Sequence, residues 1–379
     1  MEKRVFRKRT IGVTILWMIM IVLTACSHPN GNDRLGVPSN TPAGDLWTRT
    51  GRLAGEIAFD MVVSAGGRPQ RGDWVVMTNA GFSEINAATT EGALDGLASS
   101  TAASRGSNTL VEVHAAPWVP LWFALYDTGS GLCSYLEVDA AVAGKSVSTG
   151  EPISETIFKT KAMERIDAAH LFAHASVCSD RLAAKPFGGN EFRIVTIANA
   201  VAQSAPVYAV RAFEFHDHYC PGVTSGILLA NYLKRHFPAV GGGYFVHSVT
   251  PWCKEDALLV MLNATPGKRS YAVEYPSETD SASRPEDLQT ACTIVYRRNG
   301  TNERWEGVIL AFRRIETGCP QTGSTLIDKL CADLWYLQRM DAPEDFVQVI
   351  RTFTLDEGVS PRDLARPGID PLKELTRMP

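Results

Sequence analysis

The chain has 379 residues, 45% of them hydrophobic, with a formal net charge of -4 and eight cysteines. This length allows two ordinary domains with real cores, and eight cysteines are too few for a disulfide-built scaffold of this size. An acidic balance does not suit a nucleic-acid binder, so we expect no nucleic-acid partner.

The amino terminus has the pattern of a lipoprotein export signal. Five basic residues lie between Lys3 and Arg9, and the apolar run Ile11 to Leu23 that follows is too short for a permanent membrane span. Thr24-Ala25-Cys26 then predicts cleavage after residue 25 and acylation of Cys26. An uncleaved anchor is the alternative, and it leaves the body on the same side of the membrane. Residues 26–46 are rich in Pro, Gly, Asn and Ser, which predicts a tether.

This signal predicts a cell-envelope protein that is held by lipid at the outer membrane or at the extracytoplasmic face of the plasma membrane. Cleavage would remove five basic residues and one acidic residue, which leaves a net charge of -8 on the mature body.

Residues 47–150 are predicted to form a mixed α/β domain. Residues 73–81 (DWVVMTNAG) have the pattern of a strand that runs into a turn, and Thr89 to Ala102 has helical spacing after a threonine cap. The apolar runs 120–127 and 132–138, joined by a Gly-rich turn, predict a β-hairpin.

Residues 151–190 are predicted to be a helical connector, with Ser154 to Ala184 mostly helical. His170, His174 and Cys178 stand at steps of four along this helix. They could hold a second metal ion, although such a stripe is more typical of partly buried structure.

Residues 191–379 are predicted to form an α+β domain. Its expected helices are Pro206–Phe215, Val223–Phe237 with Pro221 in the first turn, Glu255–Ala264 and Ser324–Met340. Its expected strands are Tyr244–Thr250, Tyr271–Tyr275, Thr293–Arg298 and Arg304–Phe312, with Asn299-Gly300 as a tight turn between the last two.

Two short motifs carry the most specific chemistry in the chain. Residues 215–222 read FHDHYCPG, and residues 251–257 read PWCKEDA. Two imidazoles and two thiols are ligands that divalent transition metals favour, zinc above all, so the candidate ligands are His216, His218, Cys220 and Cys253. Both cysteines precede a predicted helix, where free backbone amides favour a thiolate.

The spacing of these ligands limits the geometry. Positions i, i+2 and i+4 of an extended strand stand about 6.5 to 7 Å apart, so the first segment must bend or only some of its residues bind. Two alternatives remain: Cys220 and Cys253 could form a disulfide, and His216 could cap a helix or fill a polar pocket. Cys319 and Cys331 could pair as a disulfide.

Charged residues near the motifs have candidate supporting roles. Asp217 and Asp256 could orient an imidazole, and Asp217, Glu255 or Asp256 could act as a general base if the metal is catalytic. Lys268 lies in a Thr-Pro-Gly-Lys turn and could hold an anion near the metal.

These motifs resemble the FmdE-like family, which takes its name from formylmethanofuran dehydrogenase. Its pattern is FHGHxCPG, then a strand, then C-x-x-DA and a Thr-x-Gly-Lys turn, and the resemblance covers about residues 190–315. It implies the family's helix-strand-helix-three-strand core and a bound metal at His216, His218, Cys220 and Cys253.

The sequence departs from the family pattern in several places. Asp217 stands where the family usually has Gly, Leu259 where Gln is common, and Ala264 where Cys is common. The sequence after these motifs also lacks the family's Cys-x-x-Cys ribbon. Export argues against the reaction in the family's name.

Three functions fit these observations. The first is an envelope lipoprotein that binds a divalent metal ion, with the membrane, a small-molecule ligand and a second copy of the chain as partners. The second is a metal-dependent enzyme, hydrolytic or related, whose ion keeps an open position. The third is a thiol-disulfide protein that uses Cys220 and Cys253.

Overall fold

The computed structural model describes residues 42–70, 73–149, 152–239, 241–298 and 304–377. The predicted export signal, Cys26 and the Asn299-Gly300 turn lie outside these ranges. Among the helices within them, none has both the length and the hydropathy that crossing a bilayer requires.

The first sheet has five strands in the order β4-β1-β5-β6-β7, with β1 and β4 parallel and the other pairs antiparallel. The strands are β1 (Trp74–Thr78), β4 (Leu110–Glu112), β5 (Trp122–Asp127), β6 (Leu132–Val138) and β7 (Phe158–Arg165). The predicted strand at 73–81 and the predicted hairpin are confirmed. A two-stranded ribbon, β2 (Glu84–Ile85) with β3 (Ala88–Thr89), follows β1 in the chain order.

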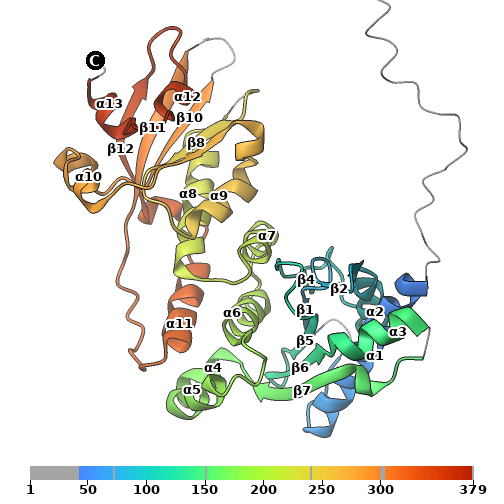
Figure 1. Cartoon of the computed structure of the whole chain (residues 1–379). Helices are drawn as coiled ribbons and strands as arrows, with labels where there is room; N and C mark the ends of the chain where they lie inside the picture. Colours follow the sequence, from blue (N-terminus) through green and yellow to red (C-terminus); the bar gives the residue numbers. More distant parts are fainter. Residues whose placement is uncertain (1–41, 71–72, 150–151, 240, 299–303, 378–379) are drawn as a thin grey trace, which may run out of the picture. The chain divides into compact units, whose positions relative to one another are not determined.

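Both faces of the first sheet are covered, which explains why its central strands are apolar along their whole length. Val76 and Phe123 face α1 (Pro42–Ser64), α2 (Gly92–Thr101) and α3 (Ala140–Thr149), while Val75 and Trp122 face the helices that follow β7. The arrangement can be followed in Figure 1.

Helix α1 corrects the predicted extent of the tether. The helix begins at Pro42, whereas the composition predicted a tether up to Leu46. Leu46 and Trp47 are almost completely buried in the core between α1 and the sheet. Burial of these side chains outweighs the loop-like composition of the preceding residues.

The predicted helix from Ser154 to Ala184 is wrong in its first part. Residues 158–165 form β7, which pairs antiparallel with β6 along the sheet edge. The sequence FKTKAMER alternates between buried or half-buried and exposed positions at its start, which is the two-residue period of a strand. Two short helices follow, α4 (Ala168–Ala173) and α5 (Ala175–Ala183). The predicted domain limits stay a prediction.

The second sheet confirms the prediction that residues 191–379 have an α+β fold. The described chain as a whole is therefore a mixed α and β fold. Its strand order is β12-β11-β10-β8-β9; β8 and β9 are parallel, and the other pairs described in this sheet are antiparallel. The strands are β8 (Tyr244–Ser248), β9 (Tyr271–Val273), β10 (Thr293–Arg298), β11 (Trp305–Phe312) and β12 (Val347–Thr354).

The predicted helices of this half are present, and others join them. The helices are α6 (Glu191–Ala202), α7 (Val207–His216), α8 (Pro221–His236), α9 (Lys254–Leu262), α10 (Glu278–Ala282), α11 (Thr325–Leu337), α12 (Pro361–Leu364) and α13 (Pro371–Arg377). Local sequence patterns did not predict α6, α10, β12, α12 and α13. Helices α8 and α9 pack on one face of the sheet, and α12 and α13 on the other.

Helix α11 lies within the predicted range Ser324–Met340, and it buries Leu330, Leu334 and Leu337. Cys319, which precedes the helix, forms a disulfide with Cys331 on it. The described residues contain five further cysteines, and all five are free thiols, including Cys220 and Cys253.

Glu214 on α7 connects the two halves of the chain. Its carboxylate is buried and accepts hydrogen bonds from the Arg105 guanidinium at 3.0 and 3.1 Å and from the Glu112 backbone N–H at 3.0 Å. The His114 backbone N–H donates to the Glu214 carbonyl at 2.9 Å. These bonds hold the edge strand β4 against the end of α7, two residues before His216.

Candidate metal centre

Three helix ends bring an imidazole and two thiols together. His216 is the last residue of α7, Cys220 precedes the first turn of α8, and Cys253 precedes α9. One ligand atom from each of the three lies within 4.8 Å of the other two. The His216 Nε2 to Cys220 Sγ distance is 3.9 Å.

Two glycines of α8 allow Cys253 to approach Cys220. A Cβ placed on Gly222 would lie 2.8 Å from Cys253 Cβ and 3.0 Å from its Sγ, and one on Gly226 would lie 2.3 Å from the Lys254 carbonyl oxygen. Any side chain at either position would therefore push the start of α9 away from α8. The Gly-x-x-x-Gly spacing thus sets the distance between the two thiols.

The segment bends at Asp217, which resolves the spacing problem of an extended His-x-His-x-Cys strand. Asp217 ends α7 with a φ of +69°, in the left-handed region that usually requires Gly. This position explains why the FmdE-like pattern has Gly there. Asp is among the few other residues that tolerate this backbone conformation.

Each imidazole of the segment is held by a different carboxylate. His216 Nδ1 hydrogen-bonds Asp256 Oδ2 at 2.6 Å, which leaves Nε2 toward the thiols. His218 Nδ1 hydrogen-bonds Asp217 Oδ1 at 2.5 Å, and Arg193 donates to the other Asp217 oxygen at 2.8 Å. His218 is not part of the three-ligand group, although its ring centroid lies 4.4 Å from that of His216.

The electrostatics of the site favour a charged sulfur at Cys253. A hydrogen bond from Cys220, and then one from His216, lowers the pKa of the Cys253 thiol. The same bond to Cys253, together with burial, raises the pKa of Cys220. Burial opposes the positive charge of His216, but hydrogen bonds with Asp256 and Cys253 outweigh it and raise its pKa to about 9.

A comparison with known families matches this part of the chain. Residues 215–328 match the family described as FmdE, Molybdenum formylmethanofuran dehydrogenase operon. The chain carries an FmdE domain. The matched range begins one residue before His216 and includes all three clustered ligands. A search of curated proteins finds no match.

The donor set of the FmdE domain fits a metal ion. A tetrahedral zinc ion with one nitrogen ligand at about 2.0 Å and one sulfur ligand at about 2.3 Å separates the two by about 3.5 Å. The 3.9 Å between His216 Nε2 and Cys220 Sγ is close to that separation. The site is therefore compatible with metal binding.

Two of the predicted supporting residues in the FmdE domain, Glu255 and Lys268, do not contact the histidines of the motif. Glu255 belongs to a buried network in which it accepts from Ser248 Oγ at 2.6 Å and from Tyr271 and Lys254. Lys268 is exposed and bonds Asn263. Only Asp217 and Asp256 among the four predicted supporting residues contact a histidine of the motif.

The His170, His174 and Cys178 stripe does not assemble a second group of three ligands in the described part of the chain. The helix breaks at His174, which separates α4 from α5, and Cys178 is buried in the core.

Several residues that shape the site were not predicted from the sequence. Arg193 on α6 holds Asp217, and a basic residue on a separate helix gives no local signal. Asp333 on α11 is fully buried, and neither of its carboxylate oxygens has a hydrogen-bond partner among the described residues. Tyr219, between the ligands, donates to the Asp333 carbonyl at 3.0 Å. Among the features that shape the site, the Gly-x-x-x-Gly spacing of Gly222 and Gly226 is the one local sequence signal that could have indicated the close approach of two helices.

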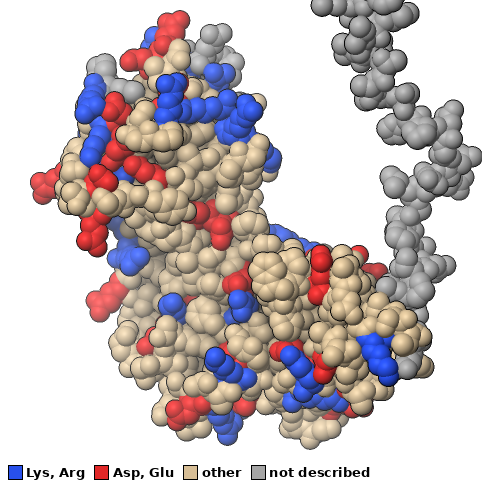
Figure 2. Space-filling view, in the orientation of Figure 1, with Lys and Arg blue, Asp and Glu red and all other residues tan. Residues whose placement is uncertain are grey.

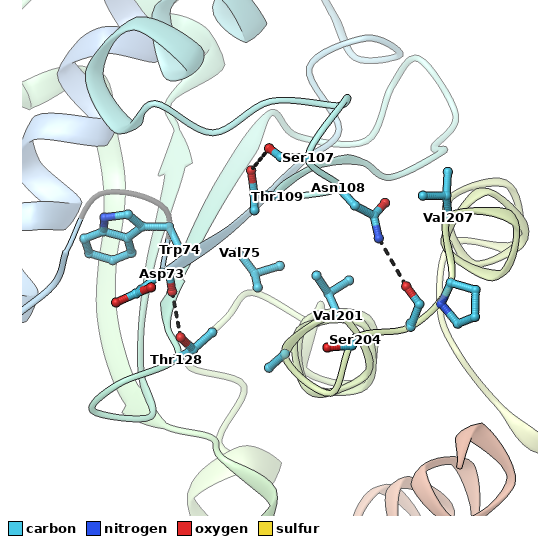
Figure 3. A pocket seen from close by; sticks show the side chains of 13 residues that line it. Asp73, Trp74, Val75, Ser107, Asn108, Thr109, Thr128, Val201, Ser204 and Val207 are labelled. Carbon is cyan, nitrogen blue, oxygen red and sulfur yellow. Dashed lines mark hydrogen bonds between the residues drawn. The ribbon is translucent and has the colours of Figure 1, made fainter. Parts of the chain in front are cut away.

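A cavity of about 450 Å³ lies between β1, the 107–109 loop and the turn from α6 to α7. Figure 3 shows the Asn108 side chain bonded to the Ala205 carbonyl across it, and the Ser107 and Thr109 hydroxyls bonded to each other. No residue of the three-ligand group lines this cavity.

Proposed function

We propose that this protein is a lipid-anchored cell-envelope protein whose FmdE domain binds one divalent transition-metal ion, zinc above others. The observation that carries the proposal is the convergence of His216 Nε2, Cys220 Sγ and Cys253 Sγ within 4.8 Å. Two sulfur ligands and one imidazole favour zinc over hard cations such as Mg²⁺ or Ca²⁺, which take oxygen ligands.

Neighbouring side chains orient His216 and favour the thiolate form of Cys253, and both effects support cation binding. Asp256 holds His216 in the orientation that points Nε2 at the thiols, as carboxylates commonly do behind a zinc-bound imidazole. The lowered pKa of Cys253 supplies a thiolate, the form that binds metal. Binding would release the proton that His216 holds in the metal-free protein.

A metal-dependent enzyme is the second candidate, and the three-ligand count favours it. Catalytic zinc sites commonly keep three protein ligands and an open position for water or substrate, whereas structural sites use four. In the proposed site His218 stands beside the ligands with its Nδ1 engaged by Asp217. His218 as a fourth ligand would instead close the coordination shell.

The proposed envelope location is supported by the Cys319 to Cys331 disulfide, because disulfides persist in oxidising compartments. The export signal in the sequence supports the same location. Metabolic labelling with a radioactive fatty acid tests it: the protein should take up label, and Cys26→Ser should abolish uptake. An unlabelled wild-type protein would refute the lipid anchor.

Metal analysis of the purified protein tests the central proposal. We expect about one ion per chain, lost in Cys220→Ser and Cys253→Ser and retained in Cys292→Ser, a buried free thiol outside the cluster. Retention of the ion in both cluster variants would refute metal binding at this site. Thiol titration before and after chelation separates this result from a disulfide, which stays unreactive in both states.

The coordination number then separates the two candidate functions. The cobalt-substituted protein should show a tetrahedral spectrum, and an exogenous ligand such as azide should perturb it only if one position is open. A His218→Ala variant that converts an unresponsive spectrum into a responsive one would identify His218 as the fourth ligand and exclude the open site.

A further inference from the structure

A second cavity, of about 670 Å³, opens on the face of the second sheet opposite α8 and α9. Its walls come from β8, β9, the segment that leads into α10, and the α12 to α13 region. These elements can be followed in Figure 1. None of the three clustered metal ligands lines it, so it is a separate site.

The cavity is bordered by a buried imidazole without a partner. His247 on β8 is 2% exposed, and its Nδ1 has no hydrogen-bond partner among the described residues. Burial lowers its pKa to about 4, so the ring is neutral at pH 7. The ring therefore adds no charge to the cavity wall.

Charged groups line the rest of the cavity, and most of them are paired. Arg284, which is buried behind the wall, donates to Asp370 at 2.9 Å and to Glu274 at 3.3 Å. On α13, Arg377 pairs with Glu374 at 2.6 Å. Figure 2 shows acidic and basic side chains side by side over α10 and α13.

Lys373 is the exception among these charged groups. It lines the cavity from α13, and its ammonium group makes no hydrogen bond or ion pair within the described ranges. Glu274 and Asp280 line the same cavity as Lys373, and among the described residues neither carboxylate forms a bond with its ammonium group. A carboxylate can accept up to about four hydrogen bonds, so these acids keep free acceptor sites.

We infer that this cavity binds a small zwitterion that carries one ammonium and one carboxylate group, as a free α-amino acid does. The ligand carboxylate would accept from Lys373, and its ammonium would donate to Asp280 and Glu274, while the His247 ring forms part of the cavity wall. Four carboxylates and three basic side chains line the cavity, so a ligand without net charge suits it better than a doubly charged phosphate. The volume lies within the range of small-molecule sites.

Histidine-ring NMR on the purified protein tests the inference. The protein, labelled with ring ¹³C-histidine, is titrated with L-alanine, and the His247 signal is identified by its loss in His247→Gln. We expect a saturable shift of that signal. Acetate and methylammonium, which each carry only one of the two charges, should bind at least tenfold more weakly.

Two lysine variants provide the matched comparison. Lys373→Met should weaken the L-alanine response at least tenfold, and Lys268→Met, at an exposed lysine outside this cavity, should leave it unchanged. Chelation of the metal should not alter the response. No shift with L-alanine, or a response to acetate of equal strength, would overturn the inference.

Discussion

The carboxylate behind the proposed metal ligand gives the sharpest prediction. Asp256→Asn keeps the size of the side chain and an acceptor for the His216 Nδ1–H, but it removes the negative charge 2.6 Å from that nitrogen. The charge supports the basicity of the Nε2 lone pair, which would bind the metal. We therefore expect weaker zinc binding with an intact fold when affinity is measured above the His216 pKa of about 9, because below it the easier loss of the His216 proton offsets part of the effect.

The exposure of Asp256 sets the size of this effect. Removing such a carboxylate typically weakens metal affinity by about 10-fold to 100-fold, or roughly 1.4–2.7 kcal/mol. The Asp256 side chain is 34% exposed, so solvent screens its interaction with the imidazole. The expected loss is thus close to the lower limit, about tenfold.

Competition with a chromophoric zinc chelator measures the two affinities, and Asp217→Asn is the matched control. Asp217 holds His218, and Asn also tolerates its left-handed backbone conformation. If His216 is the ligand, Asp217→Asn should change zinc affinity by less than threefold. A larger loss in Asp217→Asn than in Asp256→Asn would show that His218 binds the metal and His216 does not.

Three further predictions concern stability, each measured as the free energy of unfolding in urea. Glu214→Ala should lower it by about 2–3 kcal/mol, because a buried carboxylate that accepts from several donors is lost. Glu112→Gln, which removes a half-exposed ion pair with Arg105, should lower it by less than about 1 kcal/mol. Equal losses in the two variants would contradict this reasoning. Reduction of the Cys319 to Cys331 disulfide, whose partners are 12 residues apart, should lower it by about 3 kcal/mol, and an unchanged midpoint in reductant would count against the bond. His247 titrates at about 4 when folded and 6.5 when unfolded, so its contribution is present above pH 6.5 and is lost as pH falls through 4. Wild type should therefore lose about 2–3 kcal/mol more than His247→Gln between pH 7 and pH 4, and parallel pH profiles would refute the assignment.

Local patterns predicted the second half of the chain well. Helices α7, α8, α9 and α11 and strands β8 to β11 follow from amphipathic spacing, Pro221 at a first turn and apolar runs bounded by Gly and Pro. Residues 158–165 were predicted to be helical because their pattern also suits a helix, but pairing with β6 makes them strand β7. The start of helix α1 was not predicted because the loop-like composition of this segment does not indicate that Leu46 and Trp47 are buried.

The sequence alone determined which residue types could bind a metal, because His and Cys side chains in two short motifs define the donor chemistry. It also determined that the His-x-His-x-Cys segment had to bend or to bind with only some of its residues, since an extended strand holds alternate side chains too far apart. Tertiary structure alone decided which imidazole joins the thiols. Asp217 turns the chain with positive φ, and Asp256 reaches His216 from α9, which approaches α8 across Gly222 and Gly226. That choice depends on contacts between residues up to 40 positions apart, and no local pattern encodes such distances.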